Sequence, residues 1–349
     1  METKIWDLRQ YKNENSQFPY INEIKRIFEQ GGLIAIPTET VYGLAGDARN
    51  DQAIKKIYEA KGRPSDNPLI VHIHDLKQMQ HFTQGITDEI KLLMNHFWPG
   101  PISFILPLKK GYLCESVSGG LSSIAVRMPS HSIGRLILQV VDIPLAAPSA
   151  NLSGRPSPTT FEHVYSDLNG RINGMVNGDQ SEEGLESTVL DCTQFPFRIA
   201  RPGSITKPMI EAVLPFSVST ANTLDNDKPI APGMKYKHYS PDTPLQIVQA
   251  FNEKPSEEKD WSQTAFIVPN DKRAFVPEQS IFIELCKNEN DIKGANHNLY
   301  KILHHIDQDE QIKIAFIYGF EITDHTIAIM NRMMKAASQT IVKGDQLCE

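Results

Sequence analysis

The chain has 349 residues, of which 40% are hydrophobic and 22% charged, with a formal net charge of −7 at pH 7. This length exceeds one typical domain, so we expect two, and the acidic balance argues against a protein that grips nucleic acid through a broad basic surface. Four cysteines without a CxxC pair are typical of a reducing cytoplasm. The N-terminus lacks the apolar core of a signal peptide, and no apolar run approaches the roughly 18 residues that span a bilayer. We therefore expect a cytoplasmic protein without a membrane segment.

The first predicted elements are a helix over residues 20–30 and a short buried strand over residues 32–36. Pro37 ends this strand, because a proline cannot donate to a sheet ladder. A polar turn follows, in which two glycines allow sharp bends; it carries Thr38, Glu39, Thr40, Tyr42, Gly43 and Gly46. The next predicted helix covers residues 51–60, with Asp51 as its expected cap. A loop with two cations, residues 61–68, then leads to a buried strand over residues 69–73.

The chain up to residue 215 continues as alternating helices and strands joined by long polar loops, which favours an α/β class with a mixed sheet. The predicted helices cover residues 75–82, 87–98, 132–141 and 207–213. The predicted strands cover residues 102–108, 123–127, 145–147, 174–177, 187–191 and 197–201.

A change of pattern near residue 215 marks a domain boundary. We predict a first domain at residues 1–215, a polar linker at residues 216–243 and a second domain at residues 244–349. The second domain alternates short apolar strands with helices and carries no glycine-rich nucleotide fingerprint. It is therefore predicted to be a small parallel, Rossmann-like α/β domain.

Long cations lie next to predicted strands and helices of the first domain. Lys61 and Arg63 follow a helix, whereas Arg127 and Arg201 each end an apolar strand. Because guanidinium matches phosphate geometry bidentately, cations grouped around one cleft would suit a triphosphate. Each of them is equally compatible with a surface cation or a structural ion pair.

Residues 149–154 form a loop dense in hydroxyl and amide groups, whose backbone N–H groups could cradle phosphate. It is not a Walker A motif, and an ordinary turn or helix cap is the alternative. Thr40 and His72 are candidates for fixing a small amino acid, although a histidine in an apolar strand is more often a satisfied core residue. The sequence shows neither a zinc cluster nor a nucleophile elbow, and the cysteines lack an evident activator.

The motifs together resemble the threonylcarbamoyl-AMP synthase family, which has the YrdC-type fold and acts in tRNA modification. They are PTETVYGL (37–44), KGRPSDNPLIVHI (61–73), SSIAVRMPSH (122–131), PLAAPSANLSGRPSPTT (144–160), ESTVLDC (186–192), RPGSIT (201–206) and APGMKYKHYSP (231–241). The last motif is typical of the long, two-domain members. The resemblance implies a YrdC-like first domain, with a twisted mixed sheet flanked by helices.

This resemblance implies a nucleotidyltransferase that converts L-threonine, bicarbonate or CO2, and ATP to L-threonylcarbamoyl-AMP and pyrophosphate. The product would supply a separate transferase complex that modifies ANN-decoding tRNAs, so direct tRNA contact would be at most weak. The chemistry needs no protein nucleophile; it needs positioning, charge neutralisation and a water-poor cavity. Mg²⁺ would arrive on the ATP phosphates, without ligands from protein side chains.

By motif position, the resemblance assigns three groups of residues. L-threonine would be held by Thr40, His72, Arg127, Ala147 (through its backbone) and Ser187. ATP would be held by Lys61, Arg63, Asn67, Ser123, Ser149, Ser157, Arg201 and Tyr239. A lid that excludes water would include Lys235 and His238, beside Tyr239. The second domain is expected to anchor this lid or to dock a partner.

Two alternative functions belong to other classes. One is a non-catalytic RNA-binding module of the same fold, which the net charge disfavours and which RNA affinity falling steeply with salt would support. The other is a carbamoyl-adenylate enzyme of the hydrogenase-maturation type, which shares the YrdC-type core.

Overall fold

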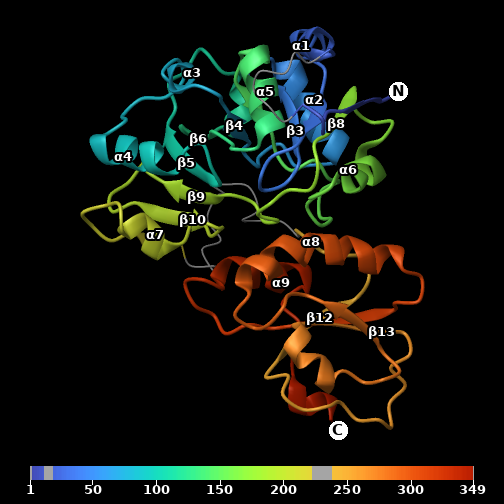
Figure 1. The fold of residues 1–349 in the computed structure, drawn as a ribbon. Coiled ribbons are helices and arrows are strands. Elements are labelled where there is room, and N and C mark those ends of the chain that lie inside the picture. The colour runs from blue at the N-terminus through green and yellow to red at the C-terminus, as the bar shows by residue number, and fades with distance from the viewer. Residues whose placement is uncertain (1, 12–18, 222–237, 349) are drawn as a thin grey trace. The chain divides into compact units, whose positions relative to one another are not determined.

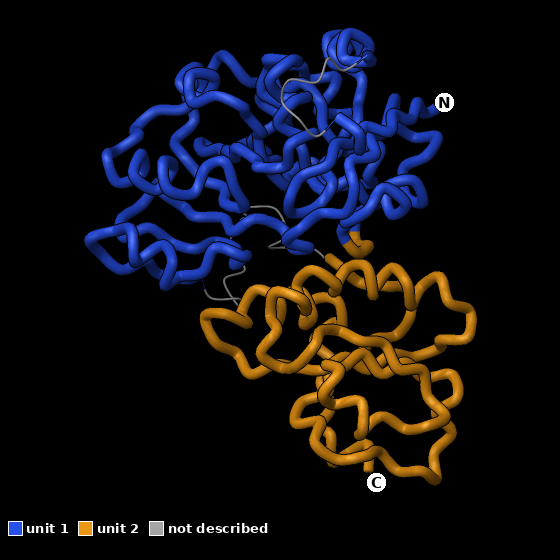
Figure 2. The backbone as a smooth tube through the Cα atoms, viewed as in Figure 1, with its two compact units in different colours: residues 1–153, 157–236 blue, residues 154–156, 237–349 orange. Residues whose placement is uncertain are grey.

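The computed structural model describes residues 2–11, 19–221 and 238–348. Its contacts divide the chain into two compact units, one of residues 1–153 and 157–236 and the other of residues 154–156 and 237–349 (Figure 2). Residues 154–156, which begin at the last residue of the predicted polar loop 149–154, therefore group with the C-terminal part of the chain. Most of the predicted linker, including Lys235, lies outside the described residues.

The described part of the first unit contains one mixed sheet of eleven strands, in the order β1-β8-β2-β3-β7-β4-β6-β5-β9-β10-β11 (Figure 1). Strand β6 pairs in parallel with β4 and antiparallel with β5. This confirms the predicted mixed sheet. The strands are β1 (Lys4–Asp7), β2 (Ile34–Ile36), β3 (Gly43–Asp47), β4 (Ile70–His72), β5 (Ile102–Pro107), β6 (Ser123–Arg127), β7 (Leu145–Ala146), β8 (Gly174–Asn177), β9 (Thr188–Asp191), β10 (Arg198–Arg201) and β11 (Ser219–Thr220).

Helices cover the sheet of the first unit on both faces. Neighbouring residues of β2 point to opposite faces, and Ile34 and Ala35 accordingly belong to two different buried clusters. One cluster also contains residues of α1 and α5, and the other contains residues of α2, α4 and α6. The helices are α1 (Ile21–Glu29), α2 (Asp51–Lys61), α3 (Leu76–Met79), α4 (Asp88–Phe97), α5 (Ser132–Val141), α6 (Phe161–Leu168) and α7 (Lys207–Glu211), with a 3-10 turn at Glu115–Ser118.

The structure corrects two local expectations near the predicted polar turn. Residues 43–47, which we expected to continue the turn, form β3 and pair antiparallel with β2. Glycine suits this strand because it is packed closely: a Cβ on Gly46 would lie 3.0 Å from Leu33 Cδ2. The cap of α2 is Asn50, whose side chain accepts from the N–H groups of Gln52 and Ala53, and not Asp51.

The second unit contains a five-stranded sheet in the order β14-β13-β15-β12-β16, and every pair in it is parallel. This confirms the predicted parallel α/β fold, although its last strand was not predicted. The elements are β12 (Leu245–Gln249), β13 (Thr264–Val268), β14 (Ile281–Glu284), β15 (Ile314–Tyr318), β16 (Ile341–Lys343), α8 (Ile292–Gln308) and α9 (Ile327–Ala336), with 3-10 turns at Asn270–Phe275 and Gly344–Leu347. No helix in the described part of the chain is long and apolar enough to cross a membrane.

Candidate active site

Two adjacent parallel strands bring His72 and Arg127 together. They are the last residues of β4 and β6 and lie directly opposite each other in the sheet register. On the other side of β4, β7 places Leu145 opposite His72. The chain then reaches Ala147, whose backbone N–H donates to the carbonyl oxygen of Ile70 at 3.0 Å. The backbone N–H of Ala147 is therefore bonded within the first unit.

Arg127 is held by the turn between β2 and β3. Its Nη2 lies 2.7 Å from Oε1 of Glu39, and both side chains are about 95% buried, with 5% and 4% exposure. Its Nη1 donates to Oγ1 of Thr40 at 2.8 Å, and its Nε donates to the carbonyl of Gly100 at 3.3 Å. These three contacts fix the position of the guanidinium. Breaking the ion pair would be costly, because it would leave an uncompensated buried charge.

His72 is 3% exposed, and burial together with the charge of Arg127 lowers its pKa from 6.5 to about 3. Its Nδ1 has no hydrogen-bond partner among the described residues. A buried polar atom without a partner is costly, so it is rare in folded proteins unless it serves a ligand or a bound water. His72 is thus a neutral hydrogen-bonding group available to a ligand.

Ser187, a predicted contact of L-threonine, is hydrogen-bonded to Arg201, a predicted contact of ATP. Arg201 donates from Nη2 to the backbone oxygen of Ser187 at 2.9 Å and to its Oγ at 3.1 Å. Oγ of Ser187 is also 2.8 Å from Oγ of Ser103, which is fully buried in β5. Arg201, Ser187 and Ser103 therefore form one buried hydrogen-bonded group.

The buried side chain of Lys61 donates hydrogen bonds to the polar loop of residues 149–154. Its side chain is buried, and its Nζ donates to the backbone oxygens of Ser149 and Asn151. Burial, with the nearby charge of Arg63, places the pKa of Lys61 well below its usual value. The ammonium is therefore directed at the loop that carries Ser149.

The other predicted ATP residues of the first unit occupy different surroundings. Arg63 donates to the backbone oxygen of Pro68 at 3.3 Å, and Asn67 is 1% exposed with an Oδ1 that has no partner among the described residues. Ser157 donates to Oε1 of Glu186 at 2.5 Å. Ser123 begins β6 and so lies about 13 Å along the strand from Arg127, at the opposite end. The structure does not bring Ser123 to the cluster around Arg127.

The described lid residues, His238 and Tyr239, belong to the second unit. Tyr239 is 4% exposed; its ring centroid is 5.5 Å from that of Tyr300, and the guanidinium of Arg332 lies 5.9 Å from the same ring. His238 Nε2 is buried and its ring lies 5.5 Å from that of Tyr239. Lys235 lies outside the described residues.

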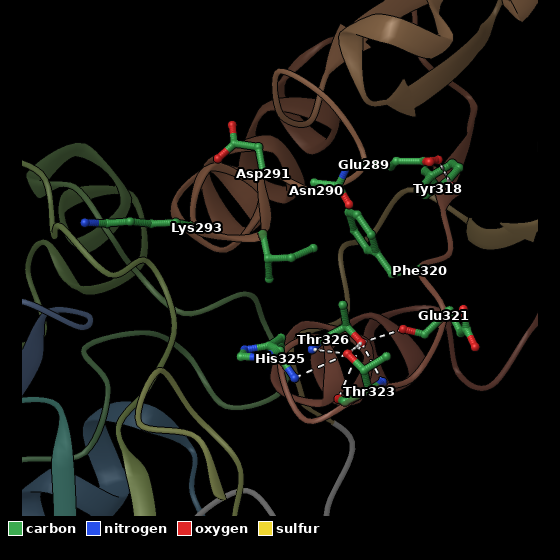
Figure 3. A pocket seen from close by; sticks show the side chains of 11 residues that line it. Glu289, Asn290, Asp291, Lys293, Tyr318, Phe320, Glu321, Thr323, His325 and Thr326 are labelled. Carbon is green, nitrogen blue, oxygen red and sulfur yellow. Dashed lines mark hydrogen bonds between the residues drawn. The ribbon is translucent and has the colours of Figure 1, made fainter. Parts of the chain in front are cut away.

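Each unit has a pocket, and they differ in their polar groups. The pocket of the first unit, about 570 Å³, is lined by Glu39 and by residues 130–132 and 178–182. The pocket of the second unit, about 610 Å³, lies beyond the carboxyl end of β15 (Figure 3). Its threonines bond to each other and to nearby backbone, and Lys293 extends away from the other labelled side chains. No residue lining this second pocket has a buried side-chain polar atom without a hydrogen-bond partner among the described residues. In the first unit such atoms occur on the predicted site residues His72, Asn67 and Arg127.

No three His, Cys, Asp or Glu side chains in the described ranges are grouped so as to hold a metal ion. Burial raises the pKa of the thiols of Cys192, Cys114 and Cys286. These thiols are therefore poor nucleophiles, and the candidate chemistry rests on hydrogen-bonding and charged groups.

Sequence reasoning missed two site residues. Glu39 was placed in the polar turn but given no role, and Ser103 was treated as part of an apolar strand. A signal for each exists in the sequence: Glu39 stands between Thr38 and Thr40 in the first motif, and Ser103 is the one hydroxyl in the strand ISFILP. A single polar residue in a buried strand predicts a buried partner.

Comparison with known proteins covers nearly the whole chain. A family model described as "Telomere recombination" matches residues 26–203, and one described as "Threonylcarbamoyl-AMP synthase, C-terminal domain" matches residues 205–338. The chain is 41% identical to the threonylcarbamoyl-AMP synthase of Bacillus subtilis, over 98% of this chain and all of that protein. It is 37% identical to that of Pyrococcus abyssi, over 90% of this chain and 93% of that protein. The crystal structure of P. abyssi Sua5 complexed with L-threonine superposes with a TM-score of 0.86 at 33% identity, covering 98% of this chain and 99% of that one.

Proposed function

The chain belongs to the threonylcarbamoyl-AMP synthase family in its long two-domain form, and we propose that it forms L-threonylcarbamoyl-AMP and pyrophosphate from L-threonine, bicarbonate or CO2, and ATP. The observation that carries this proposal is the buried group around Arg127. It combines a fixed guanidinium, a hydroxyl and a neutral imidazole with an available nitrogen. Such a group suits a small amino acid with a carboxylate.

The reaction proceeds in two bond-forming steps. The neutral amine of threonine attacks the carbon of CO2 and loses one N–H proton to water, which gives a carbamate. A carbamate oxygen then attacks the α-phosphorus of ATP. The bond from that phosphorus to the bridging oxygen breaks, and pyrophosphate leaves with the electron pair. Both steps depend on holding three reactants in a dry cavity, because no protein atom forms a bond to substrate.

The residues divide between the substrates as follows. Arg127, His72, Thr40, Ser187 and the backbone of Ala147 face L-threonine. ATP is assigned to Arg63, Asn67, Ser123, Ser149, Ser157, Arg201 and Tyr239, with Lys61 acting by holding the loop of Ser149. The family motif assigns Lys235 and His238 to a lid. Mg²⁺ bound to the triphosphate would supply charge neutralisation.

The product is a mixed anhydride of a carbamic acid and AMP, and it must be consumed by group transfer. We place that transfer in a separate complex that modifies the adenosine of ANN-decoding tRNAs, with little direct tRNA contact by this acidic chain.

Isotope labelling tests the proposed product. Purified protein is incubated with L-threonine, ATP, Mg²⁺ and ¹³C-bicarbonate, and the adenylate is analysed by mass spectrometry. A threonylcarbamoyl-AMP ion heavier by one mass unit than that from ordinary bicarbonate is expected. An adenylate of threonine without the carbamoyl group, or a product without the label, would refute the proposed reaction.

A further inference from the structure

Neither carboxylate oxygen of Glu39 accepts a hydrogen bond from a described residue, and only Oε1 lies in the ion pair with Arg127. Glu39 is 3% exposed, and its Oε1 is paired with Arg127 at 2.7 Å. Its Oε2 is buried and accepts no hydrogen bond from any residue that the structure describes. Because a buried charged oxygen is costly to leave without a partner, this oxygen is a candidate contact for a ligand.

The direction of the hydrogen bonds at Thr40 can be deduced. Thr38 Oγ1 lies 2.6 Å from the backbone oxygen of Val41, which can only accept, so Thr38 donates its proton there. In the 2.9 Å contact between the two threonine hydroxyls, Thr40 must then be the donor. Arg127 carries no acceptor and donates to Thr40 from Nη1. The hydroxyl of Thr40 has therefore used its proton and offers only a lone pair.

Glu39 and Thr40 thus present two neighbouring acceptors, and one of them is negatively charged. A carboxylate or phosphate placed there would find no proton and would meet like charge. The pocket that Glu39 helps to line agrees in sign, because Asp179 and Glu182 also line it and no lysine or arginine is among its lining residues, all of which are described. The ligand group that fits these two acceptors is a cation with several N–H protons to donate.

We propose that Glu39 Oε2 and Thr40 Oγ1 form the subsite for the ammonium group of the amino-acid substrate, and that Glu39 also positions Arg127 for the carboxylate. The inference rests on the proposed function, since it assigns one end of L-threonine. Two of the five guanidinium protons of Arg127 have no partner named here and can reach a carboxylate beside the ammonium. The ammonium and carboxylate of one amino acid thereby meet opposite charges at adjacent positions.

Two ligands distinguish this contact from a purely structural role of Glu39. L-Threonine and (2S,3R)-2,3-dihydroxybutanoate, which has a hydroxyl in place of the amine, are titrated calorimetrically into wild type and Glu39→Gln. The variant should lose about tenfold or more in affinity for L-threonine and change little toward the dihydroxy acid. Glu182→Gln, which changes another acid of the same pocket, is the matched control and should leave both affinities unchanged.

An equal loss for both ligands in Glu39→Gln, or no loss for either, would overturn the subsite. If the wild type bound no L-threonine at all, the proposed function would fail as well, so the two failures are distinguishable.

A measurement on the wild type alone covers the case in which Glu39→Gln does not fold. If the site binds the ammonium form, affinity for L-threonine must fall as the pH rises through the pKa of the ligand amine, while affinity for the dihydroxy acid must not. The titratable and charged protein groups around the subsite are Glu39, His72, Arg127, His131, Asp179 and Glu182, and the dihydroxy acid reports any effect of their titration. Affinity for L-threonine that is constant or rises over this range would overturn the inference.

Discussion

His72 and Arg127 lie directly opposite each other at the carboxyl ends of β4 and β6. Burial and the nearby guanidinium lower the pKa of His72 from 6.5 to about 3. The imidazole is therefore neutral at any pH at which the protein works, and its role is hydrogen bonding without charge.

This shift in pKa predicts how stability depends on pH. Between pH 6.5 and about 3, the unfolded chain binds a proton at His72 that the folded chain does not, so the free energy of unfolding falls as the pH is lowered through this range. His72→Asn should weaken that dependence by up to about 1.4 kcal/mol per pH unit, measured by urea denaturation at pH 7.5, 6 and 5. A wild-type slope in His72→Asn would contradict the assignment.

Lys61 is predicted to act on ATP through the loop it holds. Lys61→Met keeps the apolar stem but removes the donors to Ser149 and Asn151, so KM for ATP should rise about tenfold, which corresponds to roughly 1.4 kcal/mol. Lys56→Met on the same helix, where the lysine donates to Gly31 at the surface, is the matched control. A larger effect on KM for L-threonine than on KM for ATP would exclude this role.

Ser103 is predicted to orient Ser187. Ser103→Ala removes the 2.8 Å contact between the two hydroxyls and should weaken L-threonine binding about three- to tenfold, equivalent to roughly 0.5–1.5 kcal/mol. The buried Ser118, which bonds locally to Glu115, gives the control Ser118→Ala. Calorimetric titration decides the matter: unchanged affinity in Ser103→Ala would mean that Ser187 needs no such support.

Motifs and periodicity predicted the sheet class of both units and the bounds of β6, because an apolar run that stops at a polar residue defines a buried strand. The strand predicted at residues 69–73 extends one residue beyond β4 at each end. Strand β3 was predicted as part of a turn, because glycine is depleted in strands except where close packing requires it. Here that demand comes from Leu33 and Ile57, which lie next to Gly46 only in the folded chain.

Sequence position placed Arg127 and Thr40 in one predicted site, and the structure brings their side chains into contact. The ion pair of Arg127 with Glu39 joins residues 88 positions apart, and no local pattern specifies it. Likewise, the burial of Lys61 against the Ser149 loop follows from tertiary packing, so a lysine expected to face phosphate instead faces backbone oxygens.

Arg332 is predicted to stabilise the second unit. It is completely buried, its guanidinium lies 5.9 Å from the ring of Tyr239, and its Nη1 donates to Oδ1 of Asn331 at 3.4 Å. Arg332→Met should lower the free energy of unfolding by about 1–3 kcal/mol, because the ring contact and this hydrogen bond are lost. Arg273, whose guanidinium lies 4.9 Å from the ring of Phe282 at the surface, provides the control Arg273→Met, with an expected change below about 1 kcal/mol. Equal losses in urea denaturation would show that burial of Arg332 adds nothing.

The most direct test of the central claim is pyrophosphate release from ATP by the purified protein with Mg²⁺, omitting L-threonine and bicarbonate in turn. Release should require both, and Arg63→Ala should abolish it. Release that does not depend on L-threonine, or no release with every substrate present, would contradict the account.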